Sequence, residues 1–69
     1  MQGKIKWYNE KKGYGFIEYE SMDGKIKEVF MHYTNVKELD RKNLIEGKNV
    51  KFFLYETEKG LQAKEIEVL

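Results

Sequence analysis

Hydrophobic and polar residues alternate along short segments of this 69-residue chain, and glycine, asparagine and aspartate separate the segments. A period of two residues is typical of strands that bury one face. The pattern predicts five strands, over residues 3–9, 14–20, 25–33, 49–57 and 61–68. The turn after the second contains Asp23-Gly24, a pair that favours tight hairpin turns.

A polar stretch from Thr34 to Gly47 lies between the third and fourth segments and lacks the strand pattern. We expect Thr34 to cap a short helical turn there, because its hydroxyl can accept a hydrogen bond from a free backbone N–H. Leu39, Leu44 and Ile45 are expected to hold the stretch against the core.

The number of short strands and the lack of a long helix indicate an all-β fold, either a small barrel or a sandwich. A chain of 69 residues forms a single domain, residues 1–69. It has no cysteine, which excludes a disulfide or a thiolate metal site, and His32 alone cannot form a zinc site. The core must therefore consist of aliphatic and aromatic side chains.

Alternation also assigns the two faces of each strand. Aliphatic Ile17, Val29 and Met31 belong in the core of the second and third segments. Their neighbours then share one solvent face, which carries Tyr14, Phe16, Phe30 and His32. The inward rows of the last two segments are Val50, Phe52 and Leu54, and Ile66 and Val68.

Rings on a solvent face need a reason, because a contiguous apolar patch invites association. Unpaired nucleobases stack on such rings, and stacking contributes about 1–3 kcal/mol per base with little dependence on base sequence. The alternation leaves a second interpretation open, in which the rings pack beneath a loop or against another subunit. Trp7 does not fit the outward face, since it shares the parity of Ile5 and a regular strand would turn it inward.

The charges are nearly balanced, with 13 basic and 12 acidic residues, which excludes a polycation. Their distribution is uneven: residues 1–17 contain four lysines and one glutamate, whereas residues 55–69 contain four glutamates and two lysines. An anionic partner would bind at the N-terminal segment, although the lysines could equally serve solubility. No segment is long and apolar enough for a membrane span, and no signal peptide is recognisable, so we expect a cytoplasmic protein.

A ribonucleoprotein motif, K/R-G-F/Y-G/A-F-V-x-F/Y, matches Lys12-Gly13-Tyr14-Gly15-Phe16-Ile17-Glu18-Tyr19 at seven of eight positions. Val29-Phe30-Met31-His32-Tyr33 resembles its companion motif. With Gly3-Lys4-Ile5-Lys6-Trp7-Tyr8-Asn9, Glu46-Gly47 and Gln62-Ala63, the whole chain resembles the bacterial cold-shock proteins. That resemblance implies a small five-stranded antiparallel oligonucleotide-binding barrel that binds single-stranded RNA and DNA.

The resemblance also implies roles for particular residues. Trp7 would join the stacking rings, so the first strand should depart from simple alternation. Lys6 and Lys12 would contact phosphates or base edges, and Asn9 would bind a base edge or brace its loop. The implied site comprises Lys6, Trp7, Tyr8, Asn9, Lys12, Tyr14, Phe16, Phe30, His32, Tyr33 and Arg41.

Three departures from the family pattern concern loops. The turn from Glu20 to Glu28 is about three residues longer than usual, and Leu61 replaces a common proline. In the long loop, Arg41 lies nearest the position of an aromatic residue and could stack through its guanidinium plane.

Two other functions, catalysis and protein interaction, compete with nucleic-acid binding. Catalysis is not expected, because Ser21 and His32 lack partners nearby in sequence, and no cofactor is implied. A protein-interaction module is the alternative, since such barrels also bind peptides, and the outward Phe53 could mark a second contact. We expect a monomer, with a dimer through Phe53 left open, that acts as an RNA chaperone or a regulator of transcription or translation.

Overall fold

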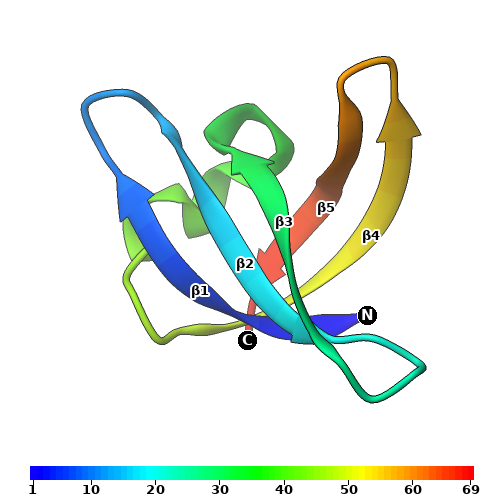
Figure 1. Ribbon diagram of the computed structural model, residues 1–69. Coiled ribbons are helices and arrows are strands. Elements are labelled where there is room, and N and C mark those ends of the chain that lie inside the picture. Colours follow the sequence, from blue (N-terminus) through cyan, green and yellow to red (C-terminus); the bar gives the residue numbers. More distant parts are fainter.

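Five strands form a closed barrel wall, and two short helical turns cross from the third strand to the fourth. In the computed structural model, which describes residues 1–69, the elements are β1 (Gln2–Asn9), β2 (Tyr14–Glu20), β3 (Ile26–His32), η1 (Tyr33–Asn35), η2 (Glu38–Asn43), β4 (Asn49–Thr57) and β5 (Gly60–Val68). The strand order is β1-β2-β3-β5-β4, with β4 closing on β1 (Figure 1). The predicted all-β barrel is confirmed, and every strand boundary lies within one residue of its expected position.

The barrel is antiparallel as expected except for one pair of neighbouring strands, which is parallel. β3 and β5 run in the same direction and pair through Phe30 and Gln62, whereas the other four pairings are antiparallel. The reason is topological: strand directions cannot alternate all the way around a closed wall that has an odd number of strands. Parallel strands cannot be joined by a tight turn. The polar stretch between β3 and β4 gives the chain the length it needs to bring β5 beside β3 in the same direction.

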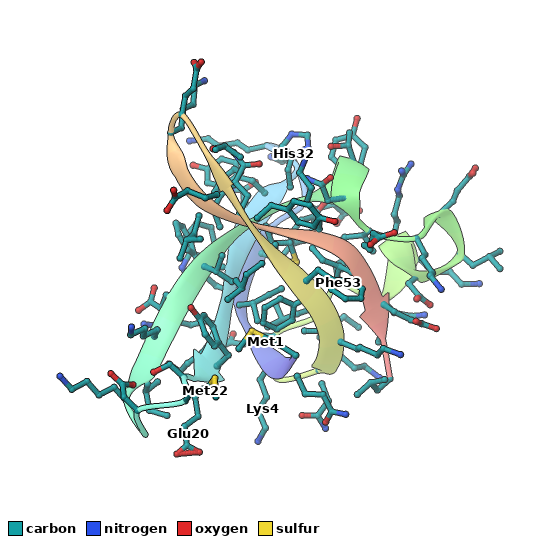
Figure 2. All side chains as sticks on the ribbon, turned by 90° about the vertical axis from the view of Figure 1, so that its right-hand side faces the viewer. Met1, Lys4, Glu20, Met22, His32 and Phe53 are labelled. Atoms are coloured by element: carbon teal, nitrogen blue, oxygen red, sulfur yellow. The ribbon has the colours of Figure 1, made fainter.

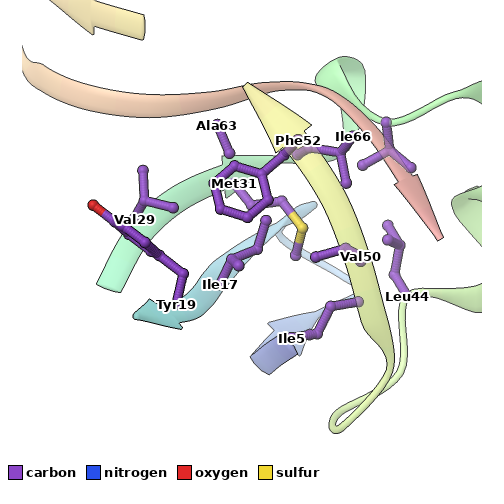
Figure 3. Packing of buried hydrophobic residues seen from close by; sticks show 11 residues of the cluster. Ile5, Ile17, Tyr19, Val29, Met31, Leu44, Val50, Phe52, Ala63 and Ile66 are labelled. Atoms are coloured by element: carbon purple, nitrogen blue, oxygen red, sulfur yellow. The ribbon is translucent and has the colours of Figure 1, made fainter. Parts of the chain in front are cut away.

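The inward rows of all five strands meet in one core (Figure 3). Phe52 and Met31 are fully buried at 0 % exposure, as is Ile17, so the predicted inward positions are confirmed. Leu54 and Val68 pack at its margin and are half-buried. The core comprises Ile5, Ile17, Tyr19, Val29, Met31, Val36, Leu44, Val50, Phe52, Ala63 and Ile66.

The polar stretch after β3 is held differently from our expectation. Thr34 lies inside η1, and the capping group is the ring of His32, whose Nδ1 accepts a hydrogen bond from the Thr34 N–H at 3.3 Å. Leu44 is buried as expected, but Leu39 is 86 % exposed and Ile45 is 55 % exposed.

Polar contacts replace the two missing apolar ones. The carboxylate of Asp40 accepts a hydrogen bond from the Val68 N–H at 3.0 Å, and Arg41 Nε donates to the Val36 carbonyl at 3.2 Å. The backbone of Lys37 also donates to the Ile66 carbonyl at 3.0 Å. No helix of the chain is long and apolar enough to cross a membrane.

A β-bulge in β1 breaks the alternation at Lys6. Ile5 pairs with Ile17 and Trp7 pairs with Phe16, so Lys6 is an extra residue with no partner in β2. The extra residue reverses the parity of the strand. Ile5 therefore points into the core while Trp7 is 38 % exposed on the outer face. The expectation that β1 departs from simple alternation is confirmed.

Close contact between β1 and β2 accompanies the bulge. A Cβ at Gly15 would lie 2.1 Å from the Trp7 carbonyl oxygen and 2.8 Å from the Tyr8 Cα, so no larger residue fits. The absence of a side chain at Gly15 thus allows the backbone of β1 to lie directly on β2.

Substitutions on the two faces of β2 should differ in how much they lower the free energy of unfolding. Ile17→Ala should lower the free energy of unfolding by about 2–5 kcal/mol, because it removes fully buried methyl and methylene groups from the core. Phe16→Ala should cost less, because its ring lies on the outer face. Urea melts of both variants measure the difference, and a larger loss for Phe16→Ala would invert the assignment of faces.

Gly15→Ala should destabilise the barrel more than Gly24→Ala. An alanine at Gly24 meets no atom within 4 Å and is strained only by its φ of +82°, a cost of roughly 1–2 kcal/mol. At Gly15 the added Cβ collides with backbone atoms, which cannot rotate away as a side chain can. Equal midpoints in urea for the two variants would show that the approach of β1 to β2 can relax.

Candidate nucleic-acid interface

Six rings form an unbroken row on the outer face of the barrel. Trp7 lies 5.8 Å from Tyr14 and 5.3 Å from Phe16 between ring centroids, so it joins the row from β1. Phe30 lies 5.7 Å from Tyr14 and 5.9 Å from Phe16, which links β2 to β3. We call this set the ring row; its members are Trp7, Tyr14, Phe16, Phe30, His32 and Tyr33.

Strand pairing explains why the central rings meet. Phe16 is opposite Phe30, and Tyr14 is opposite His32, in the antiparallel pairing of β2 and β3. Residues directly opposite across a sheet point to the same side at about 4.5–5.5 Å between Cβ atoms. The inward neighbours on both strands are buried in the core, which fixes the register and therefore the spacing of the rings.

The far end of the row is held by hydrogen bonds. His32 Nδ1 lies 2.8 Å from the Thr34 hydroxyl and accepts a hydrogen bond from the Thr34 N–H at 3.3 Å. The ring lies 6.5 Å from Phe30 and 4.9 Å from Tyr33, with interplanar angles of 32° and 34°. His32 thus connects the strand rings to the helical turn η1.

Arg41 extends the row beyond its last ring. Its guanidinium carbon lies 5.3 Å from the centroid of the Tyr33 ring, a cation–π distance, while Nε is anchored on the Val36 carbonyl. Arg41 was expected to stack through its guanidinium plane, and the structure places that group against the protein's own Tyr33 ring.

Tyr8 lies apart from the ring row. It packs against the edge of the core, and it lines two surface hollows, one with Tyr33 and Lys12 and the other with Arg41. Burial raises the pKa of its hydroxyl, with a further contribution from the nearby charge of Glu10. The side chain therefore flanks the row at its Tyr33 end, where the two residues line the same hollow.

The turn between β1 and β2 is braced by Asn9. Its side-chain oxygen accepts from the Lys12 N–H at 3.0 Å, and its carbonyl accepts from the Gly13 N–H at 2.8 Å. Gly13 has a φ of +74°, and a Cβ there would lie 2.6 Å from the Tyr33 ring. The turn therefore lies on Tyr33, and a hollow of about 450 Å³ lined by Lys11 and Lys12 opens beside it.

Lys6 forms an ion pair that the sequence did not predict. Its Nζ lies 2.6 Å from Glu28 Oε2, and the hydrogen bond and the charge of Glu28 raise the pKa of Lys6. Glu28 is the register partner of Glu18, so Lys6 approaches a pair of like charges. The signal was present in the sequence, because Glu28 shares the outward parity of Phe30 and His32.

A second hollow, of about 480 Å³, opens beside the ring row between β3 and the β4–β5 hairpin. Phe16 and Phe30 line it on one side, and Lys59, Leu61 and Gln62 line it on the other. Sequence reasoning gave no role to Lys59 or Gln62, because it had no means of pairing β3 with β5. No group of three or more residues of the metal-ligating types is close enough to hold an ion.

Comparisons with known proteins agree with this geometry. The sequence model of the 'Cold-shock' DNA-binding domain matches residues 1–69. The chain is 42 % identical to cold shock protein CspD of Bacillus subtilis over 96 % of its own length and 94 % of that protein. It is 39 % identical to the major cold shock protein CspA of Pseudomonas aeruginosa, over 100 % of its own length and 94 % of that protein.

A solved structure, described as Drosophila Unr CSD456, superposes with a TM-score of 0.70 at 28 % identity. The match covers 99 % of this chain and 26 % of that one, so this chain spans about a quarter of its length. Together with the whole-length sequence matches, the closed five-stranded barrel identifies the fold as an oligonucleotide-binding barrel. The chain therefore belongs to the cold-shock domain family of nucleic-acid-binding proteins.

Proposed function

We propose that this protein binds single-stranded RNA and DNA by stacking unpaired bases on the ring row. The observation that carries the proposal is the contact of six rings from four consecutive elements, β1, β2, β3 and η1, on one outer face. These rings are not needed to fill the core, since the core residues belong to the other face of the same strands. A base can reach such rings only when it is unpaired, because a duplex covers both of its faces.

Lysines and Arg41 supply the contacts to the sugar–phosphate backbone. Lys11 and Lys12 project from the turn at one end of the row, and Arg41 lies at Tyr33. Lys6 lies on the bulge beside Trp7, where a phosphate could replace the Glu28 carboxylate as the partner of its ammonium. An exposed ion pair of this kind is weakened by the surrounding water, so the exchange is inexpensive.

Binding without catalysis accounts for the residues present. The side chains of the row offer aromatic faces for stacking, and its one imidazole is anchored to the hydroxyl and the N–H of Thr34, two residues further along the chain. We infer that the protein acts as a monomeric RNA chaperone or regulator, which keeps strands unpaired or marks them for other factors. Both roles rest on the same chemistry.

Phe30→Ala should weaken binding to a single-stranded oligonucleotide by roughly 5- to 150-fold, the equivalent of one stacked base. Phe30 contacts both rings of β2, so its loss interrupts the row at its centre. Quenching of Trp7 fluorescence during titration measures the affinity. Met22→Ala is the control, since Met22 is fully exposed in the β2–β3 turn. Equal or tighter binding of blunt duplex DNA by the native protein would contradict stacking.

Salt should weaken binding only modestly. Three or four phosphate contacts at a slope of about −0.7 each predict a log–log dependence of affinity on salt near −2 to −3. Glu28→Gln should strengthen binding at low salt and steepen the slope by up to about 0.7, because it removes a carboxylate and frees Lys6. Titrations at several salt concentrations test both expectations, and a slope near −8 would mean that charge rather than stacking carries the affinity.

A further inference from the structure

A second pair of outward rings lies on β4, outside the ring row. Phe53 is 52 % exposed and Tyr55 is 47 % exposed, whereas Phe52 between Lys51 and Phe53 is fully buried. Figure 2, turned by 90° from Figure 1, shows Phe53 on the wall formed by β4 and β5. Two exposed rings on alternate positions of one strand form a flat apolar surface that the core does not require.

The outer surface runs without a break from the ring row to this pair. Phe30 on β3 pairs with Gln62 on β5, and Gln62 pairs with Tyr55 on β4. All three side chains point outward, because partners across neighbouring strands lie on the same side of the wall. Neighbouring strands lie about 4.8 Å apart, so Tyr55 is about two such spacings from Phe30 across the wall.

The hollow between β3 and the β4–β5 hairpin lies along this route. Its volume of about 480 Å³ is open to solvent, and Phe30 and Gln62 both line it. Phe16, Lys59 and Glu28 also line it, so it offers a ring and a cation together with one carboxylate, which is already paired with Lys6. A strand leaving the ring row at Phe16 and Phe30 would enter this hollow first.

The charges near the second pair suit a polyanion despite the acidic composition of residues 55–69. Lys64 pairs with Phe53 across β4 and β5, and its Nζ lies 5.5 Å from the centroid of the Tyr55 ring. Of the four glutamates in residues 55–69, Glu58 and Glu65 stay exposed, and the other two are neutralised or turned to the other face. Glu67 is bound by Lys37 at 3.2 Å, and Glu56 has the opposite parity to Tyr55 along β4.

We propose that Tyr55 and Phe53, with Lys64, form a second stacking station that extends the single-strand path across β5 onto β4. The proposal rests on the function proposed above, because the same strand would occupy both surfaces. Bases would stack on the two rings, and Lys64 would exchange the Tyr55 ring for a phosphate. A nucleic acid fits better than a second copy of the chain, because a cation lies at the rings and because the surface continues into the ring row.

The test is a length series of oligothymidylates from about 4 to about 16 nucleotides, the range of site sizes of oligonucleotide-binding barrels. The double variant Phe53→Thr/Tyr55→Thr introduces β-branched residues, which suit an exposed strand, and a urea melt confirms its fold. It should match the native protein on the shortest oligomers that bind. On the longest it should bind at least about fivefold more weakly, which corresponds to one lost stack.

A charge variant gives an independent readout. Lys64→Gln should reduce the salt slope by about 0.7 on long oligomers and leave it unchanged on short ones. Lys48→Gln is the matched control, since it removes the same charge from the loop before β4. Amide resonances of Phe53, Tyr55 and Lys64 should shift with long oligomers only.

Each contrary result has its own meaning. If no short oligomer binds the native protein, the proposed function fails, whatever the β4 rings do. If short oligomers bind but the native protein and the double variant respond equally to length, the second station is wrong. Self-association that the double variant abolishes, with an unchanged response to length, would also overturn it by making this surface a contact between copies.

Discussion

The closed barrel has room for a single inner layer of side chains, and this limit determines the position of nearly every other residue. Ile17, Met31 and Phe52 fill that layer with no exposed surface. Because strand residues alternate, each inward aliphatic residue commits its neighbours to solvent. The side chains on the outer face consequently do not have to fill the core, so this face can carry aromatic rings. The residues that fill the core and the residues proposed to bind nucleic acid thus alternate in the sequence but lie on opposite sides of one wall.

Alternation predicts the structure wherever the strands are regular. It placed Ile17 and Val29 inward and Phe16 and Phe30 outward, and it located every strand. It failed at Trp7, because a bulge is a backbone feature that hydrophobic patterning does not encode; only the family resemblance anticipated it. The expected anchors Leu39 and Ile45 failed for a related reason. Hydrogen bonds hold that irregular stretch, and periodicity says nothing about which polar groups will meet. The roles of the binding residues stay predictions.

The bulge also explains the electrostatics of the outer face. Glu18 and Glu28 lie opposite each other across β2 and β3, where like charges destabilise a sheet. Lys6, the extra residue of β1, reaches Glu28, and both glutamates raise its pKa. The family resemblance implies that Lys6 contacts phosphates or base edges, as if its ammonium had no other partner. In the free protein it is instead the counter-ion of an acidic pair, so a bound strand must offer the ammonium a better partner than an exposed carboxylate.

The odd number of strands has a consequence for the outer surface. It forces one parallel pairing, and here that pairing joins β3 to β5 at Phe30 and Gln62 alone. Because β3 and β5 pair at this one position, the two strands are not held together along their whole length. The hollow lined by Phe30 and Gln62 opens between β3 and the β4–β5 hairpin. The antiparallel hairpin of β4 and β5 then carries the outward face onward to Tyr55. The feature that sequence reasoning could not supply, the pairing of β3 with β5, is therefore the one that connects the two aromatic surfaces. The order of residues along the chain does not show that these two surfaces are neighbours.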